Sequence, residues 1–223
     1  MKKNQHPPSK NYLLTLCFAA GLALLIRRWV IEPYQIPNSV MKPTLTAGDT
    51  IFVWKWPFQT KKSSKLLQRG ELIVFSEDQP LGSGNQANYI RRIIGLPGDR
   101  IEMKAGHIFL NSQPLALPQG ESPGSASESC YAEKLPSSHR AFQICIDPKS
   151  PAEFNEQKVP ENHYLAVGDW RTQTDSKKGS FWSIVPISSI EGQPWVVWLS
   201  IDYSKNTGLI PRIRWERMFQ KIE

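Results

Sequence analysis

The stretch YIRRIIGLPGDRIEM, residues 89–103, has the pattern of two β-strands joined by a tight turn. Apolar and β-branched residues fill both ends, and the GLPGD in the middle is made of the residue types that turns prefer. Similar short β-prone runs recur along the chain: residues 49–56 (DTIFVWKW), 71–78 (ELIVFSED), 106–115 (GHIFLNSQPL), 163–170 (HYLAVGDW) and 194–202 (PWVVWLSID). These runs predict a mainly β protein.

The size and composition of the chain agree with one large folded unit carrying an insertion. It has 223 residues, of which 40% are hydrophobic, enough for a substantial core. Residues 118–158 are rich in Ser, Pro and Glu, which indicates an inserted segment. The net charge is +7, but the basic residues are scattered and form no recognition motif, so we expect no nucleic-acid partner. Anionic lipid headgroups are the better candidate for a partner of the positive charge.

The N-terminal region contains an uncharged run, YLLTLCFAAGLALLI, at residues 12–26. Alone it is shorter than the about 20 residues that a spanning helix needs. Arg27 and Arg28 can extend their charged ends towards water and Trp29 suits a membrane interface, which lengthens the span to Ile31. The bulky, charged RRWVIEPY that follows lacks the small residues of a cleavage site. We therefore predict an uncleaved transmembrane anchor.

The charges on either side of this segment bear on its orientation. Lys2, Lys3 and Lys10 favour a cytoplasmic N-terminus, whereas the two arginines after the run oppose it. We predict a cytoplasmic tail over residues 1–11, an anchor over 12–31 and the rest of the chain on the other side of the membrane.

The cysteines leave one question open. Cys17 lies in the apolar run and is expected to be a small hydrophobe there. Cys130 and Cys145 flank a polar stretch, and sequence alone does not decide between a disulfide and two free thiols.

Five motifs in order give the chain a family resemblance: ALLIRRWVIEPYQIP at residues 23–37, MKPTL at 41–45, RGELIVF at 69–75, RRIIGLPGDRIE at 91–102 and VPENHYLAVGDW at 159–170. With these motifs the chain resembles the bacterial type I signal peptidases, the membrane-anchored serine proteases that remove signal peptides from exported proteins. The resemblance implies an antiparallel β-sheet core over residues 32–100 and 159–223, and a smaller inserted β-lobe over 101–158. It also implies an inner or thylakoid membrane, with the bulk of the chain periplasmic, lumenal or otherwise extracytoplasmic.

The family's chemistry uses a serine nucleophile and a buried neutral lysine that takes its proton. Aligned without a gap on IPNSVMKPTL, residues 36–45, the nucleophile position is Val40, and the lysine position in YIRR is Arg91. Valine offers no lone pair, and an arginine side chain does not deprotonate to act as a base. We therefore expect a catalytically silent homologue, a pseudoenzyme.

Ser39 is the alternative nucleophile, because it is the one hydroxyl beside Val40. In an extended segment neighbouring side chains point to opposite faces, so Ser39 would face away from the site. Sliding the loop by one residue would also break the match on one side of it.

Other parts of the site are retained by resemblance. The oxyanion hole would combine the backbone N–H of Val40 with the amide of Asn38. The substrate pockets and the supporting box fall on Ile36, Pro37, Leu45 and Ile90, and on Thr174, Asp175 and Ser176. No His, Cys or carboxylate spacing suits a metal, and we expect no cofactor.

Three functions remain open at this point. The leading one is a silent homologue that binds signal peptides or extended chains of preproteins, since adding a strand to a groove needs only backbone edges and pockets. The second is an active signal peptidase, a serine endopeptidase that uses Ser39. The third is a membrane-tethered interaction or assembly subunit with an unknown protein partner.

Overall fold

The structure is a computed structural model, and it describes residues 9–29, 31–55, 67–78, 86–115, 121–122, 129–136, 141–172, 181–203 and 212–222. Sixteen strands, one α-helix and two 3-10 turns are described in these ranges. In chain order they are α1 (Ser9–Trp29), β1 (Ile31–Gln35), β2 (Asp49–Trp54), β3 (Leu72–Asp78), β4 (Gln86–Gly95), β5 (Arg100–Lys104), β6 (His107–Leu110), β7 (Gln113–Pro114), β8 (Glu121–Ser122), β9 (Ser129–Lys134), β10 (Ala141–Ile146), β11 (Phe154–Lys158), β12 (His163–Val167), β13 (Trp170–Arg171), β14 (Trp182–Pro186), η2 (Ile187–Ser189), β15 (Ile190–Asp202), β16 (Arg212–Ile213) and η3 (Trp215–Arg217). The prediction of a mainly β protein is confirmed.

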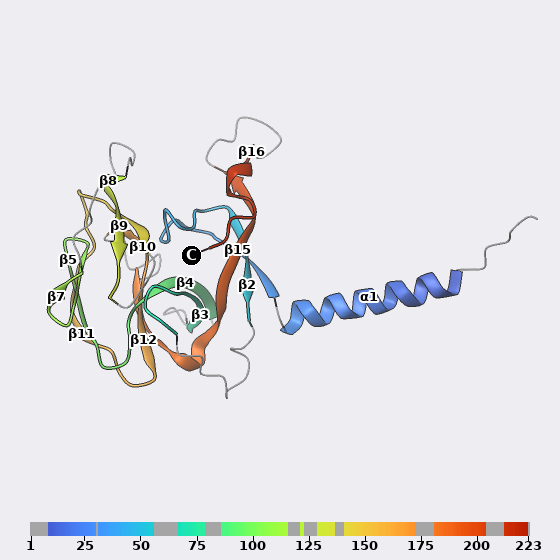
Figure 1. The fold of residues 1–223 in the computed structure, drawn as a ribbon, viewed down its shortest axis with the longest axis horizontal. Coiled ribbons are helices and arrows are strands. Elements are labelled where there is room, and N and C mark those ends of the chain that lie inside the picture. The colour runs from blue at the N-terminus through green and yellow to red at the C-terminus, as the bar shows by residue number, and fades with distance from the viewer. Residues whose placement is uncertain are drawn as a thin grey trace, which may run out of the picture.

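The largest sheet has eight strands, in the order β1-β2-β15-β3-β4-β12-β14, with β16 paired to β15. All of its pairs are antiparallel. Pro33 fits in β1 because β1 is an edge strand, where a missing backbone N–H leaves no gap in the ladder. The thirteen-residue β15 crosses the middle of this sheet (Figure 1).

Two four-stranded sheets lie beside it, in the orders β13-β10-β9-β8 and β11-β5-β6-β7. Both appear on the left of Figure 1, away from α1. β10 and β13 pair in parallel, an exception to the expected antiparallel arrangement. A disulfide joins Cys130 and Cys145, which stand opposite one another on β9 and β10. This answers the question that the sequence left open.

Apolar packing holds the sheets together in three clusters. One lies among the smaller sheets and the end of β12, and contains Ile101, Ile144 and Phe181. The second lies under the segment between β1 and β2, with Ile51 and Val74 among its members. The third lies against β3, β4 and β12, and its members include Phe75, Ile93 and Tyr164. The smaller sheets thus share their core with Val40 of the loop between β1 and β2 and with residues of β4 and β12.

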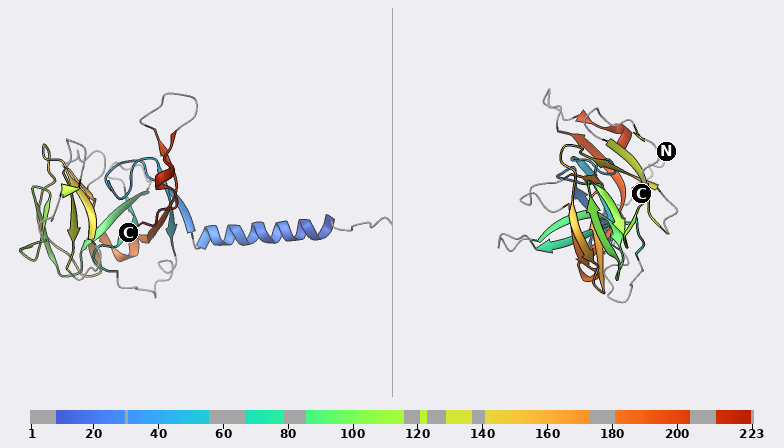
Figure 2. Two further views of the ribbon diagram at one scale, coloured as in Figure 1. Left: turned by 45° about the horizontal axis from the view of Figure 1, so that its top comes forward. Right: turned by 90° about the vertical axis from the view of Figure 1, so that its left-hand side faces the viewer.

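The helix α1 occupies most of the predicted anchor. It projects away from the β-sheets in two views (Figures 1 and 2), and apolar side chains such as Leu13 and Phe18 are exposed on it. The helix ends at Trp29, and Ile31 already belongs to β1, so the predicted segment 12–31 is not helical to its end. Within the described residues, no helix combines the length and the hydropathy needed to cross a membrane.

Candidate functional site

The segment between β1 and β2 forms a loop that is fastened at its base. The Ile36 N–H donates to the Asp49 carbonyl at 2.8 Å, and the Gly48 N–H donates to the Ile36 carbonyl at 2.9 Å. Ile36, Met41 and Leu45 are buried in the apolar cluster beneath the loop. The loop is therefore positioned by its own apolar side chains and by a closed neck.

Gly48 is required at this neck. Its φ is +90°, and a Cβ added there would stand 2.0 Å from the Ile201 carbonyl oxygen of β15. Any other residue would be strained and would push the loop away from β15.

Asp49 at the base of the loop is fully buried, and it is bonded to β15 and to the C-terminal segment. Ser200 donates to Asp49 Oδ1 at 2.6 Å and Arg217 donates to Oδ2 at 2.7 Å. Burial alone would raise the pKa of Asp49, but hydrogen bonds from Arg217, Ser200 and the Thr46 backbone outweigh it and hold the pKa below its usual value. The carboxylate is thus a fixed negative anchor for the loop.

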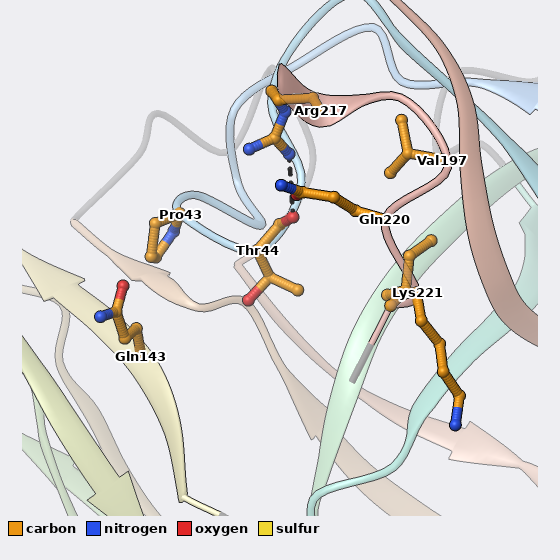
Figure 3. Close-up of a pocket in the computed structure, with 8 residues that line it drawn as sticks. Pro43, Thr44, Gln143, Val197, Arg217, Gln220 and Lys221 are labelled. Carbon is orange, nitrogen blue, oxygen red and sulfur yellow. Dashed lines mark hydrogen bonds between the residues drawn. The ribbon is translucent and has the colours of Figure 1, made fainter. Parts of the chain in front are cut away.

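Arg217 also donates to the Thr44 carbonyl at 3.0 Å, the contact drawn as a dashed line in Figure 3. A pocket of about 220 Å³ lies beside this contact. Pro43 and Thr44 reach it from the loop, whereas Gln143 comes from β10 and Gln220 from the C-terminal segment (Figure 3).

Val40 and Ser39 lie in different environments within the loop. The Val40 side chain is buried and belongs to the apolar cluster of the smaller sheets, whereas Ser39 is exposed. Val40 packs so closely on Gly168 that a Cβ added to Gly168 would stand 2.6 Å from Val40 Cγ1. These residues lie in a bend and turn rather than in the extended segment that we assumed, but the two side chains still face different surroundings.

The two predicted oxyanion donors are bonded to each other. The Val40 N–H donates to Asn38 Oδ1 at 3.4 Å. In this arrangement the side-chain oxygen of Asn38, rather than its side-chain NH₂ group, faces the backbone of Val40.

Arg91 lies on β4 and is 3% exposed. Its Nη1 donates to the carbonyl oxygen of Ile90 at 2.7 Å, and its guanidinium carbon lies 5.5 Å from the centre of the Tyr89 ring. Burial lowers the pKa of Arg91 to about 10, against the attraction of Tyr89, Glu77 and Asp169. At pH 7 only roughly one molecule in a thousand would carry a neutral side chain here, so the group is a cation.

Arg92, the next residue, holds the surroundings of the site together. Its guanidinium donates to both oxygens of Asp169, from Nε at 2.8 Å and from Nη2 at 2.7 Å. It also donates to the Gly70 carbonyl at 2.7 Å and to Thr44 Oγ1 at 3.2 Å, and Thr44 Oγ1 donates to Asp169 Oδ2 at 2.5 Å. A single buried cation thus links β4, the loop and the residue that precedes β13.

Sequence reasoning did not assign this role to Arg92, Asp169 or Thr44, although all three stand in quoted motifs. It also missed Asp49 and Arg217, which are 168 residues apart in the chain. Asp49 stands between Gly48 and Thr50, and Arg217 stands between Glu216 and Met218, so neither local pattern indicates the pairing.

A second pocket, of about 240 Å³, gathers five of the eleven predicted site residues: Ile36, Pro37, Asn38, Ile90 and Arg91. Its lining is Tyr34, Gln35, Ile36, Pro37, Asn38, Met41, Ala87, Asn88, Tyr89, Ile90 and Arg91. Leu45 does not line it but is fully buried in the core beneath. Thr174, Asp175 and Ser176 lie outside the described residues. The loop and the first half of β4 therefore face one another across a small pocket that includes Arg91.

Comparison with known proteins places this chain in a family. Residues 9–199 match the family described as "Signal peptidase, peptidase S26". Signal peptidase I of Pseudomonas aeruginosa is 29% identical over 229 residues, covering 93% of this chain and 78% of that protein. Signal peptidase I S of Bacillus subtilis is 31% identical over 182 residues, covering 79% of this chain and 85% of that protein.

A cyanobacterial relative from Synechocystis, a probable signal peptidase I-2, is 29% identical and covers 87% of this chain and 77% of its own length. A crystal structure of a signal peptidase I from Enterococcus faecalis covers 58% of this chain and 97% of its own, with 21% identity and a TM-score of 0.31. The family match spans most of the chain, so the chain belongs to the signal peptidase family, peptidase S26.

Proposed function

We propose that this chain is a membrane-anchored signal peptidase homologue that binds signal peptides, or extended chains of preproteins, without cutting them. The observation that carries the proposal is the pair of side chains at the family's reacting positions. Val40 has no lone pair to attack a carbonyl, and Arg91 keeps its proton at neutral pH. The pocket lined by Arg91 and by Asn38 and Met41 of the loop supports the proposal that the chain binds peptides.

Ser39 is poorly placed to substitute for the nucleophile. It is exposed, while its neighbour Val40 is buried against Gly168. Within the part of the chain that the structure describes, its hydroxyl makes no hydrogen bond, so no base is positioned to take its proton.

The membrane anchor belongs to the same proposal. It is supported by the uncharged run at residues 12–26 and by the exposed apolar side chains of α1, which stands clear of the sheets. The N-terminal tail would be cytoplasmic, and the β-sheets would face the periplasm, a lumen or the outside of the cell. Membrane lipids would then be contacts of α1.

A cleavage assay tests whether the chain is catalytically inactive. The full chain, purified in detergent, is incubated at pH 7 with a preprotein, and signal peptidase I of Pseudomonas aeruginosa serves as the positive control. We expect no mature product from this chain, while the preprotein crosslinks to it. A mature product cut at the Ala-x-Ala boundary would overturn the proposal, and its loss in Ser39→Ala would then identify the active alternative. Absence of crosslinking together with a stoichiometric protein partner would favour an assembly subunit.

Restoring the two reacting groups tests whether the scaffold is intact. The double variant Val40→Ser, Arg91→Lys supplies a hydroxyl and a lysine whose pKa burial lowers towards neutrality. We expect cleavage from the double variant only. The matched single variants should stay silent, because one lacks a neutral base and the other lacks a nucleophile.

A further inference from the structure

A side-chain hydrogen bond crosses the pocket between the loop and β4. One wall of this pocket comes from β1 and the loop, and the other comes from residues 87–91 of β4. Asn88 Nδ2 on β4 donates to the hydroxyl oxygen of Tyr34 on β1 at 3.1 Å, and both residues line the pocket. Three strands, β2, β15 and β3, stand between β1 and β4 in the sheet. The bond therefore joins the two walls of the pocket and not two neighbouring strands.

Glu191 of β15 fixes the direction of the Tyr34 hydroxyl. This hydroxyl donates to Glu191 Oε2 at 2.8 Å, so its single proton is engaged and its oxygen is left to accept. Burial, followed by the hydrogen bond to Glu191, raises the pKa of Tyr34 above its usual value, so the group keeps its proton at neutral pH. Tyr34 therefore offers an acceptor to the pocket, and Asn88 offers a donor.

The bond lies where a ligand can reach it. Asn88 is exposed and Tyr34 is half-buried. Along β4, Asn88 is three residues from Arg91, which is about 10 Å in an extended strand. A single neutral hydrogen bond at the surface contributes little to stability, so the binding of a chain can open it.

Opening the bond leaves a donor on Asn88 and an acceptor on Tyr34, and the ligand decides whether they find new partners. A hydroxyl both donates and accepts, so a Ser or Thr side chain can accept from Asn88 and donate to Tyr34. An Asn or Gln amide offers the same two functions. A valine has nearly the shape of threonine but leaves both groups without a partner, which is costly in a site closed off from water.

We propose that Tyr34 and Asn88 determine the specificity of the pocket, because a bound chain opens their hydrogen bond and replaces it with a polar side chain of its own. This inference rests on the proposed function and names the ligand more closely. The preferred chain has a hydroxyl or amide side chain at the position that reaches Tyr34 and Asn88. An apolar side chain of the same size at that position binds more weakly.

Pairs of peptides that differ by one isosteric residue test the inference. A signal peptide is prepared with Thr or with Val at one position of its C-terminal region at a time. Binding of each fluorescent peptide to the full chain in detergent is measured by anisotropy. We expect one position at which the Thr peptide binds about three- to tenfold more tightly than the Val peptide, the effect of a hydrogen bond gained.

Variants of the two residues identify the groups responsible. Asn88→Ala removes the bond across the pocket and leaves Tyr34 bonded to Glu191. The Val peptide should bind this variant more tightly than it binds the unaltered chain, because no bond has to open, and the preference for Thr should shrink. Tyr34→Phe should reduce the preference as well, since it removes the acceptor and keeps the ring.

Tyr203→Phe is the matched control. Its hydroxyl accepts from Gln35 Nε2 at 3.2 Å, next to Tyr34 on β1, but Tyr203 does not line the pocket. This variant loses a tyrosine hydroxyl and should keep the full preference for Thr. A preference that survives in both Asn88→Ala and Tyr34→Phe would overturn the assignment to these residues.

The outcomes separate this inference from the proposed function. Equal binding of Thr and Val peptides at every position of the unaltered chain would overturn the selectivity and leave peptide binding standing, and this comparison requires no variant to fold. Tighter binding of the Val peptides would do the same. Failure of every peptide to bind would overturn both.

Discussion

At the scale of single residues, two adjacent arginines of β4 are both buried, but their charges are compensated differently. Arg91 is 3% exposed and Arg92 is 1% exposed. Arg92 is bonded to both oxygens of Asp169, whereas burial is the largest influence on Arg91 and lowers its pKa to about 10. The charge of Arg92 is therefore compensated by Asp169, whereas burial opposes the charge of Arg91.

This contrast predicts different effects of the same substitution. Arg91→Met should raise the free energy of unfolding by about 1 to 3 kcal/mol, because an apolar side chain of similar length removes a buried cation. Unfolding in urea, followed by circular dichroism at pH 7, measures the change. A lower stability of Arg91→Met would mean that its contacts with Ile90 and Tyr89 outweigh the burial of the charge.

Arg92→Met is the matched control, one residue away on the same strand. It leaves Asp169 buried without its cation, and breaking a buried pair in this way typically costs about 3 to 5 kcal/mol. The control should therefore unfold at a clearly lower urea concentration than the unaltered chain.

At the scale of elements, the strands that the sequence predicts are those whose apolar residues reveal them. Both arms of residues 89–103 are found, as β4 and β5, with the turn between them. β1 and β9 were not predicted, because IEPYQ contains a proline and SCYAEK contains mostly polar residues. These strands depend on pairing with β2 and β10, and sequence does not show such pairing.

The sequence also predicted part of the lining of the second pocket, the one of about 240 Å³ beside β4. The motif register places Ile36, Pro37, Asn38, Ile90 and Arg91, and the structure brings these five to one pocket. The register did not reveal the burial of Val40 against Gly168, which depends on a residue 128 positions away (168 − 40). Contacts of this kind follow from topology and not from local pattern.

The neck of the loop carries a prediction about acid. Asp49 has a lower pKa in the folded chain than in the unfolded chain, because Arg217, Ser200 and the Thr46 backbone outweigh the effect of burial. Its stabilising effect is therefore full above the unfolded pKa of about 4 and is lost as the pH falls through the folded value. We expect stability to decline steeply below about pH 4.

Asp49→Asn checks the origin of that decline, because asparagine does not titrate. The variant should be less stable than the unaltered chain at pH 7 and should lose less stability between pH 5 and pH 2. Asp99 remains in both proteins and has a lowered pKa as well, from Arg69, Leu96 and Asn111 acting against burial, so some acid dependence persists. Equal slopes in the two proteins would exclude Asp49 as a source of the acid sensitivity.

At the scale of the whole molecule, a disulfide and a buried ion pair stabilise the smaller sheets. The disulfide between Cys130 and Cys145 ties β9 to β10, and a buried ion pair joins Glu133 of β9 to Arg171 of β13. A disulfide persists in an oxidising compartment, which agrees with the proposed placement of the sheets outside the cytoplasm. Neither cysteine lines the pocket of about 240 Å³ between the loop and β4.

Reduction should therefore act on one part of the molecule more than the other. The two cysteines are 15 residues apart, and opening a loop of that size should lower stability by about 3 kcal/mol. Hydrogen exchange should then rise most in β9 and β10, whereas β3 and β4 keep their protection and the peptide affinity of the pocket changes little. The double variant Cys130→Ala, Cys145→Ala should reproduce this pattern without a reductant.

A fall in peptide affinity along with the protection of β9 would contradict this expectation, because the pocket and the smaller sheets would then form one cooperative unit. Val40 would be the contact that couples them, since its side chain packs into the apolar cluster of those sheets.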